Sequence, residues 1–207
     1  MPNIAGFLVA LVLAGFATQA GALIVAADLT GRPGVQTEAL PPAGTVPLFP
    51  PSVDVFVGSE MEATIAADAG DLFNGIAALS TELELAGLIV TFDAPVFGLQ
   101  FFGGLTDEFD VFLDGSVTFT VGLDTLDLPV SAAGPTAMGL MSDAAFTQAT
   151  LTVQSFDLDP SAVAFLSASS VSATATPIPL PSSGPLLLSI AALFAAARRI
   201  RGRGLSV

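Results

Sequence analysis

Four acidic residues that lie close together are the first candidates for site chemistry: Asp107, Glu108, Asp110 and Asp114. Carboxylate oxygens are the ligands that Ca²⁺ prefers, but this spacing matches neither the EF-hand loop nor the RTX repeat. The simpler interpretation is an acidic, solvated surface that keeps the protein soluble. We therefore expect no resident cofactor and no metal, with Ca²⁺ bound by these four residues as the alternative.

The composition excludes several other kinds of chemistry. The chain of 207 residues has no His, Cys, Lys, Trp or Tyr. It therefore cannot form an ordinary zinc site, a Ser-His-Asp triad, a thiol nucleophile, a disulfide or a lysine Schiff base. A glycosidase needs two carboxylates placed across a sugar, and sugar clefts usually add Trp or Tyr platforms that this chain lacks. We expect a protein that is not an enzyme, with polysaccharide binding through polar side chains as an alternative.

Charge is distributed unevenly along the chain. All 19 Asp and Glu residues lie between Asp28 and Asp159, where Arg32 is the one basic residue, so this part carries a net charge of −18. The other four arginines lie at the C-terminal end, which reduces the formal net charge of the whole chain to −14. This strongly negative part of the chain, the body of the protein, repels a phosphate backbone, so nucleic acid is not an expected partner.

The N-terminal residues have the pattern of a secretory signal peptide. An apolar run over 7–14 precedes small residues, and Ala20 and Ala22 form the A-x-A pattern that signal peptidase accepts. No Lys or Arg precedes the apolar run, which departs from the usual pattern. We expect signal peptidase to cleave after Ala22, with Ala20 as the second choice; the alternatives are a buried helix of the domain and a misassigned start codon.

The C-terminal residues fall into three parts: a Ser/Thr/Pro stretch over 167–183, a short apolar segment and an arginine cluster. The first part is expected to be a flexible linker. A helix over 185–197 would be about 20 Å long, shorter than the roughly 30 Å hydrocarbon core, and arginine side chains that reach the interface make up part of the difference. The span residues are Pro185, Leu186, Leu187, Leu188, Ile190, Leu193 and Phe194, and the stop-transfer residues are Arg198, Arg199, Arg201 and Arg203.

This three-part tail, with Pro179, Leu180 and Pro181 before the span, resembles the VPLPA-type variant of the PEP-CTERM sorting signal. Ile178 stands where Val is usual and Ser182 where Ala is usual. In that family an exosortase, a membrane-embedded cysteine transpeptidase, is thought to recognise the proline motif and cut near it. The resemblance implies an exosortase-type partner and a body that is released or transferred to a surface acceptor. The alternatives are a plain tail-anchored span and a C-terminal packing helix.

The residues between the two ends alternate between apolar and polar side chains, which predicts β-strands. Val117, Phe119 and Val121 are expected to face inward, and Asp114-Gly115 predicts a hairpin turn to a strand over 109–113. Gly87 is expected to mark a bulge, the prolines of 41–51 an extended loop, and 71–80 a short helix. The other predicted strands are 53–57, 61–66, 82–92, 97–102, 126–130, 150–156 and 163–169.

Short strands separated by turn signals predict an all-β fold, a single antiparallel β-sandwich of jelly-roll type, with a helix at each end of the chain. The expected organisation is a signal peptide over 1–22, an acidic β-sandwich over 23–166, a linker with the sorting motif over 167–183, and a transmembrane helix with an arginine-rich tail over 184–207. The expected function is that of a non-enzymatic cell-surface or extracellular-matrix protein. The alternatives are a carbohydrate- or calcium-binding surface module and a permanently membrane-anchored protein.

Overall fold

The alternating side chains of the body form β-strands throughout. The computed structural model describes residues 23–42, 46–75, 78–81, 87–155 and 164–177, and within these ranges it contains strands but no helix. Every strand pair among them is antiparallel, so the predicted all-β class is confirmed. The expected signal peptide and the tail from residue 178 lie outside the described residues.

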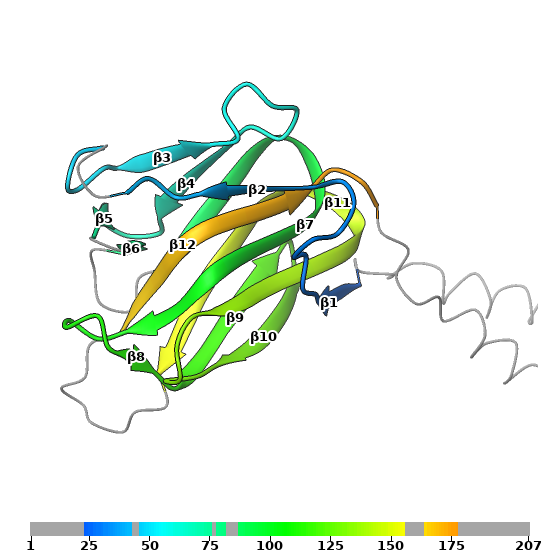
Figure 1. The fold of residues 1–207 in the computed structure, drawn as a ribbon. Helices are drawn as coiled ribbons and strands as arrows, with labels where there is room; N and C mark the ends of the chain where they lie inside the picture. Colours follow the sequence, from blue (N-terminus) through cyan, green and yellow to red (C-terminus); the bar gives the residue numbers. More distant parts are fainter. Residues whose placement is uncertain (1–22, 43–45, 76–77, 82–86, 156–163, 178–207) are drawn as a thin grey trace, which may run out of the picture.

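The described strands form one hydrogen-bonded network of 12 members (Figure 1). They are β1 Ile24–Ala26, β2 Val35–Ala39, β3 Ser52–Val55, β4 Ala63–Ala67, β5 Leu72–Asn74, β6 Leu79–Thr81, β7 Leu88–Thr106, β8 Phe112–Leu113, β9 Gly115–Val121, β10 Asp124–Val130, β11 Thr136–Ser155 and β12 Phe165–Thr174.

Two long strands, β7 and β11, connect two sets of neighbours. Their first shared stretch, β7 88–91 against β11 148–151, continues outward to β4 and β3 on one side and to β9 and β10 on the other. Their second shared stretch, β7 98–103 against β11 136–141, continues to β12 and β2 on one side and to β1 on the other. Register shifts in β11 on both sides of Phe146 separate the two stretches. Bulges of this kind bend a strand, which lets one pair of strands serve both sets.

The two sets of strands share one hydrophobic core. Ile65, Val90 and Phe119 from the first set and Leu99 and Val171 from the second all have 0% exposure and belong to one cluster. The predicted inward face of β9 is confirmed, because Val117 and Phe119 are fully buried and Val121 is 6% exposed. Strand alternation therefore directs one face of each set to the same interior.

The chain ends of the body lie on one side of the network. Val25 of β1 pairs with Met141, Met141 with Gly98, and Gly98 with Thr174 of β12, so one row of residues crosses four adjacent strands. Three strand spacings of ~4.8 Å place β1 about 14 Å from the last residues of β12. We call this row, with the β1–β2 connection that lies over it, the terminal end.

The opposite end of the same strands lies where Thr106 of β7 pairs with Phe165 of β12. Thr106 is eight positions beyond Gly98, which corresponds to about 26 Å along an extended strand. In Figure 1 the start of β12, with β5, β6 and β8, lies to the left, and β1 and the end of β12 lie to the right. We call the left side, with the loop over 107–111, the pocket end.

The predicted hairpin at Asp114-Gly115 is wrong. Phe112 and Leu113 pair with Thr106 and Leu105 of β7, while β9 begins at Gly115 and pairs with β10 and β11. The tight turn of this region instead joins β9 to β10, where Gly122 has a φ of 62°. In the strand predicted over 109–113, Phe109, Val111 and Leu113 were expected to face inward; Leu113 packs against the core, whereas Phe109 is 75% and Val111 57% exposed.

The predicted helix over 71–80 is also wrong in the residues that the structure describes there. Leu72–Asn74 form β5 and Leu79–Thr81 form β6, and the two strands pair with each other. The Phe73 ring packs against the ring of Phe49 in the proline-rich loop, and the two ring centroids are 5.6 Å apart. Contacts of this kind between separate segments of the chain override weak local helix propensity.

The predicted start of the linker at residue 167 is wrong. Residues 167–174, expected to be flexible, belong to β12, which lies between β7 on one side and β2 and β6 on the other. Ala168, Val171 and Ala173 have 0% exposure. The backbones of β7 and β12 approach closely here, because a Cβ on Gly103 of β7 would lie 2.0 Å from the Ser167 carbonyl oxygen.

Gly87 does not lie within a strand, because β7 begins at the next residue. Its backbone N–H donates to the Asp68 carboxylate at 2.7 Å, and a Cβ there would lie 2.1 Å from the Leu151 carbonyl oxygen of β11. The glycine predicted to break a long strand therefore permits a close backbone approach at the point where β7 begins.

Candidate functional site

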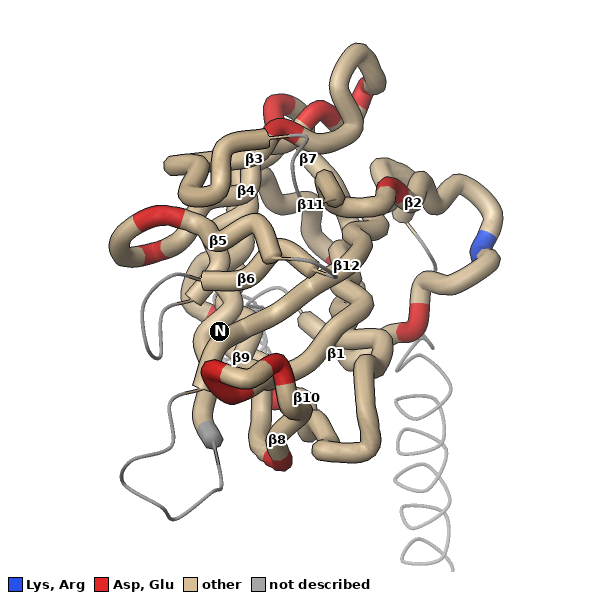
Figure 2. The backbone as a smooth tube through the Cα atoms, turned by 60° about the vertical axis from the view of Figure 1, so that its left-hand side comes forward, with Lys and Arg blue, Asp and Glu red and all other residues tan. Residues whose placement is uncertain are grey.

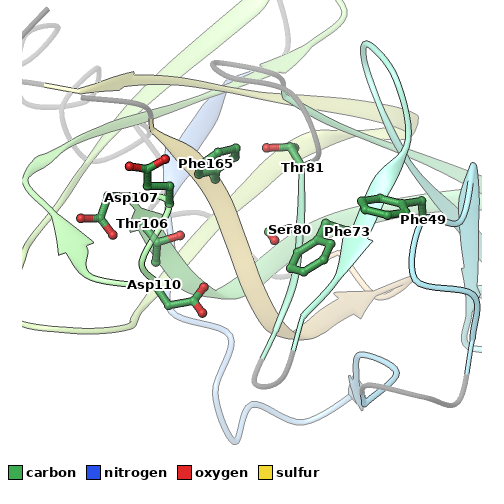
Figure 3. A pocket seen from close by; sticks show the side chains of 9 residues that line it. Phe49, Phe73, Ser80, Thr81, Thr106, Asp107, Asp110 and Phe165 are labelled. Carbon is green, nitrogen blue, oxygen red and sulfur yellow. The ribbon is translucent and has the colours of Figure 1, made fainter. Parts of the chain in front are cut away.

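A cavity of about 230 Å³ opens at the pocket end of the body. Its walls come from segments far apart in the sequence: the proline-rich loop, the β5–β6 pair, the end of β7 with the loop that follows, and the start of β12. Carboxylates lie on one side of this pocket, Phe49 and Phe73 on the other, and Phe165 and the hydroxyl groups between them (Figure 3). The lining residues are Phe49, Phe73, Ser80, Thr81, Thr106, Asp107, Glu108, Asp110 and Phe165.

The acidic side of the pocket is a loop that Asp107 holds together. Its carboxylate accepts hydrogen bonds from the backbone N–H groups of Phe109 at 2.8 Å and Val111 at 2.9 Å. A further backbone bond from Asp107 to Val111 closes the loop, and Asp110 has a φ of 60° within it. Asp107 therefore has a structural role, while the exposed Glu108 and Asp110 form the rim.

The hydroxyl groups come from strands that the register brings together. Thr106 is 4%, Ser80 9% and Thr81 1% exposed. In the part of the chain that the structure describes, the Thr81 Oγ1 atom is buried and has no hydrogen-bond partner. A buried hydroxyl without a partner is destabilising, so such a group calls for an explanation.

The electrostatic environment of the pocket is negative. Arg32 is the one Lys or Arg among the described residues, and it lies in the β1–β2 connection at the terminal end, where its Nη1 contacts the Met141 sulfur at 3.9 Å. Figure 2 shows this single basic position apart from the acidic segments at the other end of the body. Nothing in the described part of the chain neutralises the carboxylates of the pocket.

A second cavity, of about 250 Å³, adjoins the first. Thr106 and Asp110 line both. Its other lining residues include Phe112, Gly75 and Gly103. The pocket therefore continues along the sheet past Asp110 instead of ending at the acidic loop.

The four predicted calcium ligands do not converge. Asp107 bonds its own loop, Glu108 and Asp110 lie at the pocket rim, and the Asp114 carboxylate accepts a hydrogen bond from the Ala132 N–H at 2.8 Å. Within the described ranges no three acidic side chains are arranged to hold a metal ion.

The predicted routing residues lie outside the described residues. These are the cleavage residues Ala20 and Ala22, the motif Pro179 to Pro181, the span residues from Pro185 to Phe194, and the stop-transfer arginines. Among the residues that are described, no helix has the length and apolar character to cross a membrane.

One carboxylate outside the pocket has a shifted pKa. The Thr30 hydroxyl and backbone N–H donate to the Asp28 carboxylate and hold its pKa below the usual value; desolvation opposes this effect, and nearby Arg32 adds a weaker contribution in the lowering direction. This group belongs to the β1–β2 connection at the terminal end.

Comparison of the chain with family models, with curated protein sequences and with solved structures found no match.

Sequence reasoning found the acidic side of the pocket and missed the rest. Phe49, Phe73, Thr81 and Phe165 carry no local signal for a site, because each is an ordinary strand or loop residue. Only the pairing of β6 with β12 and of β12 with β7 brings them to the acidic loop.

Proposed function

We propose that this chain is a non-enzymatic protein exported to the cell surface or extracellular matrix. Residues 1–22 direct its export, and an exosortase-type transpeptidase recognises Pro179, Leu180 and Pro181 and removes the tail. The body carries no His, Cys or Lys, which removes the common nucleophiles and general bases. The observation that carries the proposal is the three-part tail, with its proline motif, apolar span and arginine cluster in this order.

The geometry of the body supports this proposal. Strand β1 begins at Ile24, two residues after the expected cleavage at Ala22, and β12 ends at Thr174, five residues before the motif. Both positions belong to the terminal end, where the row from Val25 to Thr174 crosses the strands. A body attached through either end therefore directs its pocket end away from the membrane.

We further propose that the body is a β-sandwich of jelly-roll type. In support, β7 and β11 each take part in two sets of strands, and the inward faces of both sets contribute to one core. Antiparallel sheets that face each other across a shared core are the defining feature of sandwiches.

A binding role for the body is the second candidate, and the pocket favours it over a purely structural role. The carbohydrate-binding form of this candidate predicts that a glycan array shows a saturable ligand. A permanently anchored protein is the other alternative, and it predicts that the arginine tail persists in the mature chain.

The motif is tested by substitution in the native host. An antibody against residues 198–207 reports whether the tail is present, and cell fractionation reports where the body is. We expect the wild type to reach the surface without the tail, and the variant Pro179→Ala/Pro181→Ala to accumulate in the membrane fraction with it. Pro177→Ala, a proline just outside the motif, is the matched control and should behave as the wild type. Equal processing of all three proteins would contradict the proposal.

A further inference from the structure

We propose that the pocket binds a primary alkylammonium group, of the kind carried by a lysine side chain or a polyamine. The pocket brings together carboxylates at its rim, hydroxyl groups at its base and aromatic rings on its wall. These are the three kinds of group that bind an alkylammonium: anions for its charge, oxygen acceptors for its N–H donors, and apolar faces for its methylene groups.

The charge of the site selects a cation. Glu108 and Asp110 are exposed at the rim, and the described chain offers them no basic partner, since Arg32 lies at the opposite end. A negative rim attracts cations and repels phosphates, sulfates and carboxylates. The two carboxylates therefore exclude anionic ligands and favour cationic ones over neutral ones.

The buried hydroxyl gives the site a specific polar contact. Thr81 is 1% exposed, its Oγ1 lacks a partner in the described residues, and it lines the pocket. Figure 3 shows its oxygen on the side that faces Phe165. A polar group entering the pocket would supply the missing hydrogen bond, which makes Thr81 independent evidence for a polar ligand; because the acidic rim selects a cation, that group is an N–H donor.

The size and the walls of the pocket fit an unbranched chain. Its volume of about 230 Å³ is below the roughly 300–1,000 Å³ typical of drug-sized ligand sites, and it corresponds to a side chain or a small amine. Phe73 and Phe165 are half-buried there and offer ring surface to methylene groups. The second cavity beyond Asp110 leaves room for the remainder of a longer ligand.

Binding is tested on the full chain in a neutral polyoxyethylene detergent, with 4-fluorophenylalanine as a ¹⁹F NMR probe. The Phe165→Leu and Phe73→Leu variants assign the two ring signals. We expect n-pentylammonium to shift both signals saturably, and the shift at fixed concentration to fall when the salt is raised from 20 to 500 mM, because salt screens the attraction. The uncharged control 1-pentanol should shift them at least about tenfold more weakly. Equal effects of the two probes, or no shift with either, would overturn the proposal.

Three variants locate the interaction. Asp110→Asn removes one rim charge and should weaken pentylammonium binding about threefold to fivefold. Thr81→Val removes the unpaired hydroxyl at nearly constant volume and should weaken binding about fivefold. Glu60→Gln removes an exposed charge from the β3–β4 connection and is the matched control, with an effect below about 1.5-fold. Binding that responds equally to Asp110→Asn and Glu60→Gln would reflect overall charge alone and would overturn a site at the pocket.

Two further probes distinguish the sources of the ammonium group. Spermidine stands for free polyamines, and the peptide acetyl-Gly-Lys-Gly-amide stands for a lysine on a partner protein; the tighter of the two identifies the source. A neutral oligosaccharide that shifts the same signals more strongly than either amine would overturn the proposal in favour of a sugar site. These measurements do not depend on processing of the tail, so their failure would leave the proposed export and sorting intact.

Discussion

The two ends of the β body differ in how completely their buried polar groups are paired. At the terminal end, the Gln100 side chain accepts a hydrogen bond from the Leu29 N–H at 2.6 Å and donates to the Thr30 hydroxyl at 3.3 Å. The Thr174 hydroxyl there is buried and bonds to the backbone of Thr176. At the pocket end, the equally buried Thr81 hydroxyl has no partner in the described residues. At the terminal end these buried polar side chains are thus hydrogen-bonded within the protein, whereas at the pocket end a buried hydroxyl group is left to bond a ligand.

Among the variants that compare the two ends, the largest effect is expected from adding a side chain at Gly139, where two backbone segments of the terminal end approach closely. Gly139→Ala places a Cβ 2.4 Å from the Ala27 carbonyl oxygen, which is backbone and cannot move aside. We expect unfolding by urea to show a loss of roughly 2–4 kcal/mol. Gly104→Ala at the pocket end is the control, because the nearest atoms, 3.2 Å away, belong to the Phe112 ring. A loss as large in Gly104→Ala would mean that the two ends are equally tight.

The buried amide of Gln100 is the next test of the terminal end. Gln100→Met keeps the volume but leaves the Leu29 N–H without its acceptor, and we expect a loss of about 1–3 kcal/mol in the free energy of unfolding. The exposed Gln148 of β11 provides the control, since Gln148→Met should change stability by less than about 0.5 kcal/mol. Equal losses of stability in Gln100→Met and Gln148→Met would show that the buried amide of Gln100 does not stabilise the fold.

A pair of buried threonines compares the ends directly. Thr174→Val removes a paired hydroxyl and should reduce the free energy of unfolding by about 1 kcal/mol. Thr81→Val removes an unpaired one and should leave stability unchanged or raise it by up to about 1 kcal/mol. Thermal and urea unfolding of both variants give the comparison. A loss in Thr81→Val equal to that in Thr174→Val would show that Thr81 has a partner in solution.

The smallest effect concerns Asp28. Its pKa is lowered in the folded chain, so its contribution to stability is present above the unfolded-state pKa of about 3.9 and is lost as the pH falls through the folded-state pKa. A ¹³C NMR titration of the carboxyl carbon should give a midpoint below that of the urea-unfolded chain. An equal or higher midpoint would contradict the hydrogen bonds from Thr30.

The sequence predicted the fold where side chains alternate clearly in size and polarity. β9 is such a case, since Val117 and Phe119 face inward as expected. β12 was taken in part for a linker because its Ser and Ala residues resemble a spacer, whereas these residues pair with β7 where the two backbones approach closely. The Asp-Gly pair was misleading because Asp114 bonds to the distant Ala132 N–H instead of forming a turn. Interactions between residues far apart in sequence decided both cases, and they also assembled the pocket.

We propose that the β body is exported and then freed from both routing segments at its terminal end. Intact mass spectrometry of the protein from the native cell surface tests this claim most directly. We expect a chain that begins at Leu23 and ends near Pro179 to Pro181, either free or with an acceptor group added at its new C-terminus. A mature chain that retains Arg198 to Arg203 would contradict it.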